Sequence, residues 1–418
     1  MEGLEGVARV IEQLAGVPLP VSAWEQQVLP VRVRDYVPAL LDELLATGTV
    51  VWAGHGRLGE DDGLVSLHLQ EIAAETLPLL STQPLSPLQS VLLEVLAEGG
   101  AWFVRQLAQQ VQVRWTGGPM PPVEDLHAAL WALVWDGRVT CDLWSPLRAL
   151  TGVRVPRARV LAAARRRRGL AGAPMQDASS AATRPVMGVA HLDAPSLAGR
   201  WSLLQREATP DTVRALALAE GLLDRQGVVT RGAAMAEGVA GGFAAIQQVY
   251  RRMEDAGRVL RGRFVEGLGG AQFADRTDVD RLRELAEVAD KGSVAAVALS
   301  AVDPANPFGT TLPWPAHASG VRPLRRPGGI VVIGGGRLLF YLTQGGRSLL
   351  NYVPADVPDA AEVLASAATA LVIALRRTPR LRFTLALIDD APPGKGPVTE
   401  ALRKAGFRNA PRGLNWEG

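Results

Sequence analysis

The sequence contains little cysteine and histidine. Cys141 is the single cysteine among 418 residues, which excludes an intrachain disulfide and makes a thiolate zinc site implausible. His55 and His68 fall on one expected hairpin, and the other three of the five histidines are scattered. We therefore expect structural roles for the histidines, with no metal site and no cofactor.

Lysine is almost absent. Of 44 basic residues, the lysines are Lys291, Lys395 and Lys404. Arginine pairs with phosphate oxygens in a bidentate manner, so the bias can reflect phosphate recognition, although a GC-rich genome is the simpler cause of the bias as a whole. The net charge is only +2, which excludes a generally basic, histone-like binder. Binding to a polyanion would have to come from local patches.

Long apolar runs are also missing. The longest, near residues 360–375, is short and carries Glu362, so it does not predict a membrane span. The N-terminal sequence MEGLEGVARV is acidic and lacks the apolar core of a signal peptide. These features predict a cytoplasmic, nucleoid-associated protein with no membrane partner.

The composition is that of a globular chain, with 48% hydrophobic and 21% charged residues, and its length predicts two to four domains. One pattern recurs: two short helices, a longer helix, then one or two strands, which is the order of a winged helix-turn-helix. The expected copies cover residues 1–82, 83–152 and 199–275. Between the last two, residues 153–198 are basic and then small and polar, which predicts a linker. Its run Arg165–Arg168 fits phosphate contacts and a solvated helix end equally well.

Residues 276–418 have a different pattern. Segments rich in β-branched and aromatic residues are separated by Gly-Gly pairs, which indicates the hairpins of a small sheet or barrel. The predicted fold class is therefore α+β, with tandem winged helix-turn-helix modules followed by a small β-barrel-like α+β module.

The third module offers the clearest binding surface. Its expected helix at 243–256 has an apolar stripe made of Phe243, Ile246, Val249, Tyr250 and Met253. The opposite side carries Gln247, Gln248, Arg251 and Arg252. In a winged helix this helix is presented to a DNA groove, where glutamine and arginine can contact base edges and arginine can contact phosphates. An ordinary solvated helix face would have the same composition.

The segment RVLRGRFVEGLGGAQFA after this helix predicts a basic wing. Strand alternation places Arg261 and Arg263 on one face, while Leu260 and Phe264 face the core. The predicted nucleic-acid-binding residues outside the helix are Arg231, Arg258, Arg261, Arg263 and Gln272. The alternative is a wing packed on a neighbouring module, with its arginines paired to Glu266 or Asp275.

Two further features leave alternatives open. Asp389 and Asp390 end an expected strand, and Asp390 is the candidate catalytic residue of a DNA glycosylase, although aspartate in such a turn commonly bonds its own backbone. Five tryptophans gather in the second module and suit stacking on unpaired bases, core packing or homo-oligomer contacts: Trp102, Trp115, Trp131, Trp135 and Trp144.

Several long strings resemble one family. They are GRWSLL from Gly199, GVVTRGAAMAEGVAGGFAAI from Gly227, RRMEDAGRVLRGRFVEGLGGAQFA from Arg251, and DPANPFGTTLPWP from Asp303. Together with LHAALWALVWDGRVTCDLWSPLRAL from Leu126, they are similar to the C-terminal region of Lhr, the large helicase-related proteins of bacteria. The similarity covers most of the chain and is strongest over residues 199–353.

This resemblance implies a function in DNA repair. In Lhr-like proteins a superfamily 2 helicase core precedes a tandem winged-helix array and a β-rich module, and the array is similar to winged-helix DNA glycosylases and can oligomerise. The present chain departs from that pattern because APPGKGPVTE lacks the Ser or Thr and the spaced glycines of a phosphate loop. The expected function is a DNA-binding array, for single-stranded or duplex DNA, without ATPase or helicase activity of its own. The alternatives are a DNA glycosylase and a structural module that oligomerises and docks a helicase core on a separate or longer chain.

Overall fold

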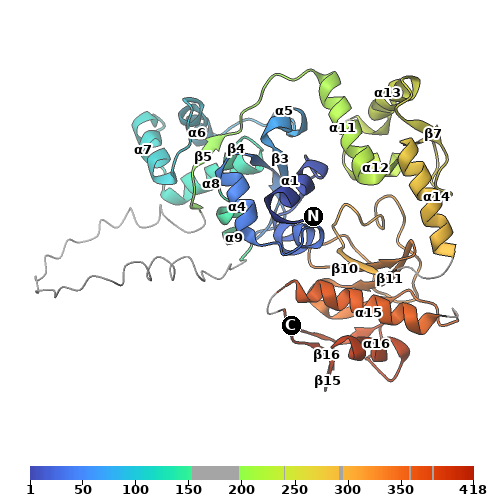
Figure 1. The fold of residues 1–418 in the computed structure, drawn as a ribbon. Helices are drawn as coiled ribbons and strands as arrows, with labels where there is room; N and C mark the ends of the chain where they lie inside the picture. Colours follow the sequence, from blue (N-terminus) through green and yellow to red (C-terminus); the bar gives the residue numbers. More distant parts are fainter. Residues whose placement is uncertain (153–196, 240, 291–294, 357–358, 379–380) are drawn as a thin grey trace, which may run out of the picture.

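Three helical modules and a C-terminal α+β module make up the chain (Figure 1). The structure is a computed structural model and describes residues 1–152, 197–239, 241–290, 295–356, 359–378 and 381–418. The expected linker at 153–198 therefore lies outside the described residues, apart from its last two positions.

The first module is a winged helix whose wing is a long hairpin. Its sheet has the order β1-β3-β2 and is antiparallel. Trp24 and Trp52 are fully buried at its centre. Its elements are α1 (Gly3–Gln13), β1 (Leu19–Pro20), α2 (Val21–Ala23), a π-helical turn (Trp24–Val28), α3 (Leu29–Arg32), α4 (Pro38–Ala46), β2 (Val50–Arg57), β3 (Gly63–Leu69), a 3-10 turn (Gln70–Ile72) and α5 (Ala73–Thr76).

The second module takes its last strand from beyond residue 198. Ser86 caps its first helix and exchanges hydrogen bonds with Gln89 in a capping box. Strand β5 pairs with β4, so Trp201–Leu203 lies in this module and not in the third, where the sequence pattern placed it. The elements are α6 (Pro87–Ala97), α7 (Val104–Arg114), α8 (Val123–Trp135), β4 (Val139–Cys141), α9 (Ser145–Leu150) and β5 (Trp201–Leu203).

Tryptophan side chains join the first two modules into one hydrophobic core. Trp52 of β2 packs edge-on against Trp144 and Trp201, with ring centroids 6.3 and 6.4 Å apart. Its indole Nε1 donates a hydrogen bond of 2.9 Å to the Cys141 carbonyl. Trp131 stacks on Trp135 at 5.3 Å and meets Trp201 at 5.8 Å. Core packing is thus the interpretation that holds for Trp131, Trp135 and Trp144.

The third module is a more separate winged helix. Its sheet has the order β6-β8-β7 and its core contains Leu222, Tyr250 and Phe273. The elements are α11 (Asp211–Gln226), β6 (Val228–Val229), α12 (Arg231–Ala236), α13 (Gly242–Asp255), β7 (Leu260–Gly262), β8 (Gln272–Ala274) and α14 (Arg276–Asp290).

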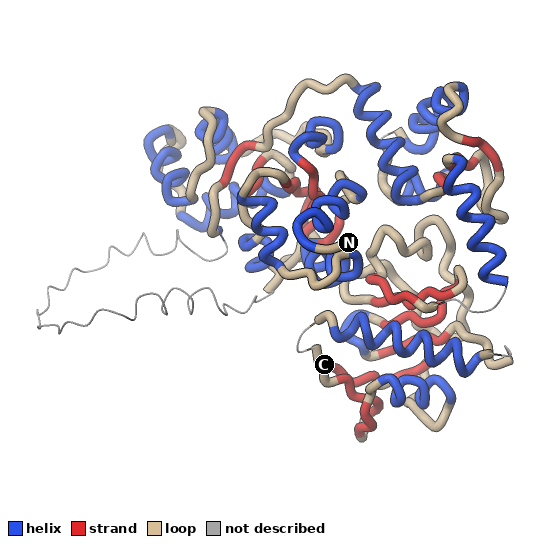
Figure 2. The backbone as a smooth tube through the Cα atoms, viewed as in Figure 1, coloured by secondary structure: helices blue, strands red, loops and turns tan. Residues whose placement is uncertain are grey.

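The C-terminal module is built on an open five-stranded sheet with the order β14-β12-β11-β10-β9. Its strands are drawn in red below the helical modules in Figure 2. Alternate residues face opposite sides, so Val332 and Phe340 pack toward α15 while Val331 and Tyr341 pack under the 301–321 loops. A closed barrel is absent from the described strands, which corrects the barrel-like expectation. The elements are β9 (Val297–Ser300), β10 (Ile330–Gly334), β11 (Arg337–Leu342), a 3-10 turn (Gln344–Gly346), β12 (Ser348–Asn351), α15 (Ala360–Arg376), β13 (Phe383–Leu385), β14 (Leu387–Ile388), α16 (Pro397–Ala405), β15 (Arg408–Ala410) and β16 (Gly413–Trp416). Among the helices described, α15 included, none has the length and apolarity needed to cross a bilayer.

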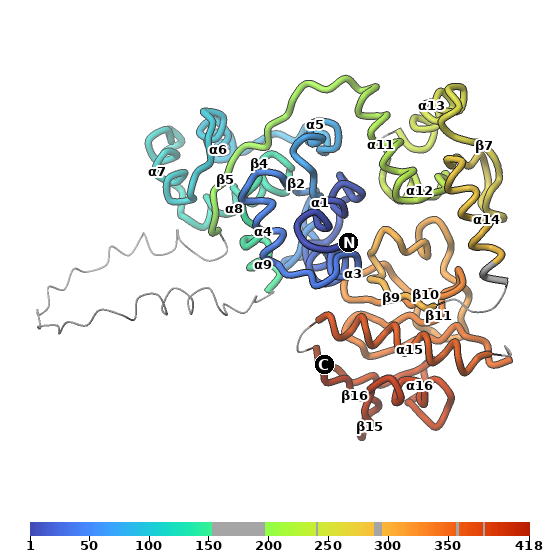
Figure 3. Tube along the Cα trace, in the orientation of Figure 1, coloured from blue at the N-terminus to red at the C-terminus, as the bar shows by residue number. Residues whose placement is uncertain are grey.

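Buried arginines fasten the modules to one another. Arg32 at the end of α3 forms a bidentate ion pair with Asp303, at 2.7 and 2.8 Å, and Asp303 is completely buried. This pair docks the first module beside the C-terminal sheet, where the blue and orange segments meet in Figure 3. Arg148 of α9 similarly bonds Glu25 and Asp42 of the first module, and these carboxylates outweigh its burial and raise its pKa.

The third module is attached in the same way. Arg214 of α11 donates hydrogen bonds to the carbonyls of Ala74 and Leu77, at 2.7 and 2.5 Å. Arg225, at the other end of α11, pairs with Glu237 and donates to the carbonyl of Gln13. Both contacts satisfy carbonyls at helix or loop ends, which would otherwise lose their hydrogen bonds on burial.

A chain of neutral hydrogen bonds crosses the wing of the first module. His55 Nε2, Ser66 Oγ, His68 Nε2, His68 Nδ1 and Thr76 Oγ1 follow one another at 2.7, 2.7 and 2.8 Å. Thr76 donates its one proton to the Ile72 carbonyl, so His68 Nδ1 must donate to Thr76 and His68 Nε2 must accept from Ser66. Burial lowers the pKa of His68 to about 3 and that of His55 to about 4, and nearby Arg206 adds to both shifts. His55 and His68 thus have the structural role predicted for them.

We expect Arg32→Met to lower the free energy of unfolding by about 3–5 kcal/mol, because it leaves the Asp303 carboxylate buried without its partner. Arg9→Met is the matched control, since Arg9 pairs with Glu12 on an exposed helix face, and we expect it to cost less than about 1 kcal/mol. Denaturant unfolding of both variants measures the difference. Equal midpoints would show that the Arg32–Asp303 pair does not hold the modules together.

We expect acid to destabilise the fold through His68 and His55. Their folded pKa values lie below the unfolded value, so the unfolded chain binds more protons below pH 6.5 and stability falls as the pH is lowered. Between pH 7 and 5 the loss should be roughly 2 kcal/mol for each histidine. His68→Gln should flatten the pH dependence of the unfolding free energy by about half, and parallel profiles for the variant and the parent would contradict this role.

Candidate nucleic-acid interface

The helix α13 is held in place by its buried stripe. Ile246, Tyr250 and Met253 are buried, as the sequence predicts, and Phe243 and Val249 are partly buried beside them. The Tyr250 ring stacks on Phe273 of β8 at 5.0 Å, and its hydroxyl donates a hydrogen bond of 2.9 Å to the Ala219 carbonyl of α11. These contacts fix the rotation of α13, so its other face must point outward.

The outward face of α13 carries the predicted polar residues. Gln248, Arg251 and Arg252 are exposed, and Gln247 is half-buried. Arg231, also exposed, begins α12 directly after Thr230, whose side chain caps that helix by accepting from the Ala233 N–H. In Figure 1, α13 and β7 lie on the side of the third module that faces away from the first two modules, and α11 lies between.

The wing carries three exposed arginines with different surroundings. Arg258 pairs with Glu220 of α11 at 2.6 Å, and Arg261 pairs with Glu254 of α13 at 3.2 Å. Both pairs are largely exposed, so each contributes less than about 1 kcal/mol and can exchange for a phosphate. Their partners are not Glu266 and Asp275, the two that the alternative interpretation suggested. Glu220 lies 38 residues from Arg258 in the sequence, and Glu254 lies on α13 and not on the wing. No local sequence pattern therefore indicated these two partners.

Four arginines of this surface have no partner among the described residues. Within the part of the chain that the structure describes, no hydrogen bond or ion pair engages the guanidinium groups of Arg231, Arg251, Arg252 and Arg263. An unpaired guanidinium retains all of its donors for a phosphate or a base edge. Their contact with DNA stays a prediction.

Gln272 is buried, whereas a nucleic-acid-binding residue is expected to be exposed. It is completely buried in β8, and its amide is used within the wing. Its Oε1 accepts from the Val265 N–H, and its Nε2 donates to the carbonyls of Val265 and Leu268, all at 2.8 Å. Gln272 therefore shapes the wing tip and is not exposed to nucleic acid. Gly267 and Gly270, with φ of 77° and 86°, complete the turn.

Asp389 and Asp390 lie in the C-terminal module, in a tight turn between β14 and α16. Both have positive φ, 51° and 64°. Asp390 Oδ2 accepts from the Gly320 N–H at 2.7 Å, and Asp389 Oδ1 accepts from the Asn351 N–H at 2.8 Å with His317 Nε2 at 3.2 Å. The two carboxylates clamp the 317–320 loop against the sheet, and the Asp390 side chain is exposed beside it.

The comparisons with known proteins point to one family. Two family models, both described as the winged-helix domain of large helicase-related proteins, match residues 1–70 and 208–294. The chain is 51% identical over 418 residues to the Lhr helicase/uracil glycosylase of Escherichia coli K12, covering 99% of this chain and 26% of that protein. It is 44% identical over 423 residues to the Lhr helicase/probable uracil glycosylase of Mycolicibacterium smegmatis, covering 99% and 27%. The chain thus spans about a quarter of the length of these curated relatives.

A solved structure, the DNA glycosylase AlkZ of Streptomyces sahachiroi, aligns with a TM-score of 0.49 and 12% identity over 87% of this chain and 91% of that one. The family models and the two relatives agree with the resemblance noted in the sequence. The chain therefore contains winged-helix domains of the Lhr type, and nearly its whole length is similar to about a quarter of each of these two Lhr proteins.

Proposed function

We propose that the chain is a DNA-binding array and that its third winged helix holds the DNA backbone. The observation that supports this most is the gathering of unpartnered arginines on the outward face of α13 and on the wing, in a chain whose net charge is only +2. Guanidinium groups on a winged helix provide the positive charge that phosphates require, at a local site and without a basic chain.

The two elements have different parts in this proposal. Gln247 and Gln248 of α13 lie nearest to the bases. The phosphates beside the groove are contacted by arginines of α13 and the wing: Arg251, Arg252, Arg258, Arg261 and Arg263. The structure of the wing favours this arrangement because Gln272 stiffens its tip from inside and leaves the arginines outside. A helicase motor in longer relatives is the natural partner of such an array, and self-association through the apolar second module stays a prediction.

A second function, removal of uracil from DNA, is favoured by the names of the two relatives, which share 51% and 44% identity with nearly the whole chain. Under this proposal Asp390 is the candidate carboxylate that positions water, since it is exposed and sits in a turn with positive φ. Its hydrogen bond to Gly320 fixes one carboxylate oxygen and leaves the other for a reactant.

The double variant Arg261→Glu/Arg263→Glu should weaken DNA binding regardless of base sequence. It should also lower the slope of log K against log salt by about two, because two phosphate contacts are lost. Fluorescence anisotropy across a salt series measures both quantities on single-stranded and duplex DNA. Arg9→Glu/Arg408→Glu is the control with the same charge change on distant exposed sites. Equal losses in both double variants would rule out a specific role of the wing.

Asp390→Asn should lower the rate of abasic-site formation from a uracil-containing oligonucleotide by at least about 100-fold. The melting midpoint should stay unchanged. Asparagine tolerates positive φ and still accepts from Gly320, but it cannot act as a base. Asp389→Asn is the neighbouring control, because that carboxylate is already engaged by Asn351 and His317. Full activity in Asp390→Asn would leave this residue as a loop clamp, and no abasic product from the parent chain would exclude the second function.

A further inference from the structure

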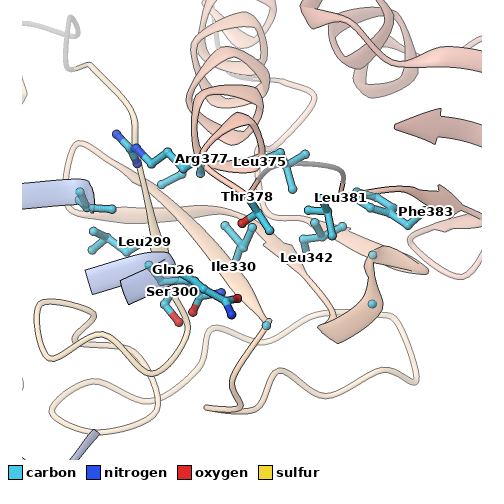
Figure 4. A pocket seen from close by; sticks show the side chains of 17 residues that line it. Gln26, Leu299, Ser300, Ile330, Leu342, Leu375, Arg377, Thr378, Leu381 and Phe383 are labelled. Atoms are coloured by element: carbon cyan, nitrogen blue, oxygen red, sulfur yellow. The ribbon is translucent and has the colours of Figure 1, made fainter. Parts of the chain in front are cut away.

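A small pocket lies where the first module meets the C-terminal sheet (Figure 4). Its volume is about 150 Å³. The first module contributes Gln26, Gln27 and Val31, and the sheet contributes Leu299, Ser300, Ile330 and Leu342. The opposite side is closed by Arg377 and Thr378 at the end of α15 and by Leu381 and Phe383.

Two buried polar atoms of the pocket lack a hydrogen-bond partner among the described residues. They are the Ser300 hydroxyl, in a residue only 3% exposed, and Oε1 of Gln27. An unsatisfied buried polar atom costs about 1–3 kcal/mol, so such atoms are normally partnered by protein, water or a ligand. Figure 4 shows Gln26 beside Ser300 on one side of the pocket, with Leu381 and Phe383 on the other. The pocket is therefore polar at one end and apolar at the other.

Arg377 supplies a positive charge at the same pocket. It is half-buried at the end of α15, and within the described chain no hydrogen bond or ion pair engages its guanidinium group. Burial lowers its pKa, and no carboxylate offsets that effect. Arg32, Arg148 and Arg214, which also lie between modules, have carboxylate or carbonyl partners. Arg377 therefore lies at the junction of the two modules without a hydrogen-bond or ion-pair partner among the described residues.

We propose that this pocket binds one pyrimidine nucleotide. A cavity of about 150 Å³ is the size that holds a single six-membered ring, as an engineered apolar cavity of that size holds benzene. A pyrimidine ring alternates hydrogen-bond donors and acceptors along its edge, which the amides of Gln26 and Gln27 and the Ser300 hydroxyl can match. The apolar wall at Phe383 and Ile330 covers the ring faces, and Arg377 contacts the phosphate.

The nucleotide can be free or can be a base turned out of a DNA strand, since both present the same ring and phosphate. The site goes beyond the proposed surface of α13 and the wing, because it belongs to the first and C-terminal modules. The arm of the test that uses a DNA strand rests on the proposed DNA binding.

The test uses the full chain and 5-fluoro-2′-deoxyuridine 5′-monophosphate, observed by ¹⁹F NMR line broadening. We expect dUMP and dCMP to displace the probe and dAMP not to do so. Ser300→Val should weaken binding by about threefold to tenfold, as for one neutral hydrogen bond, and Arg377→Met by about tenfold or more. Ser300→Val should not lower the melting midpoint without nucleotide, because its hydroxyl has no partner to lose. Thr369→Val, at a site exposed to solvent on α15, is the control.

A second probe distinguishes a free nucleotide from a turned-out base. It is a single DNA strand that carries one central 5-fluorouracil and otherwise only purines. Broadening in the strand alone, lost in Ser300→Val and Arg377→Met, assigns the pocket to a turned-out base. Broadening of the mononucleotide with the same sensitivity assigns it to a free nucleotide. If neither probe broadens, or if both pocket variants bind like the parent, the inference is overturned. Duplex DNA binding is measured separately by anisotropy with the same protein preparation. If it persists, the wing proposal stands although the pocket proposal fails; if all DNA binding is lost, the wing proposal is the one contradicted.

Discussion

Buried guanidinium groups hold the modules in one arrangement, and each candidate surface depends on that arrangement. Arg32 forms an ion pair with Asp303, and Arg148 forms ion pairs with Glu25 and Asp42. Arg214 donates hydrogen bonds to carbonyls at the end of α5. A planar guanidinium presents several donors in fixed directions, so one side chain can satisfy acceptors from two modules at once. Lysine presents its donors from a single point, which fits the scarcity of lysine in a chain built this way.

The arginines therefore form two populations with different uses. Arg32, Arg148, Arg214 and Arg225 lie between modules, are buried or partly buried and have carboxylate or carbonyl partners. They account for part of the arginine bias without reference to DNA. Those on α12, α13 and the wing are exposed, and several of them are unpartnered. The proposed DNA binding concerns the second population alone, and this is why a net charge of +2 is compatible with it.

The pocket between the first module and the sheet follows from the same docking. Arg32 brings the π-helical turn that carries Gln26 and Gln27 against β9, and the side chains there leave a gap of about 150 Å³ with Ser300 at its wall. Such a site has no counterpart in either module alone. A ligand in it would bind two modules at once and would add to the stability of their contact.

Local sequence patterns were enough to predict the individual helices and their buried faces. They predicted the buried stripe of α13 and the winged-helix order, because side-chain spacing along a helix depends on residues a few positions apart. Contacts between distant segments depend on the tertiary packing. It moved Trp201 into the second module, buried Gln272 inside the wing, left the C-terminal sheet open, and brought Gln27, Ser300 and Arg377 to one pocket. None of these follows from a local pattern, because burial and partnership are set by packing between residues that lie far apart in the chain.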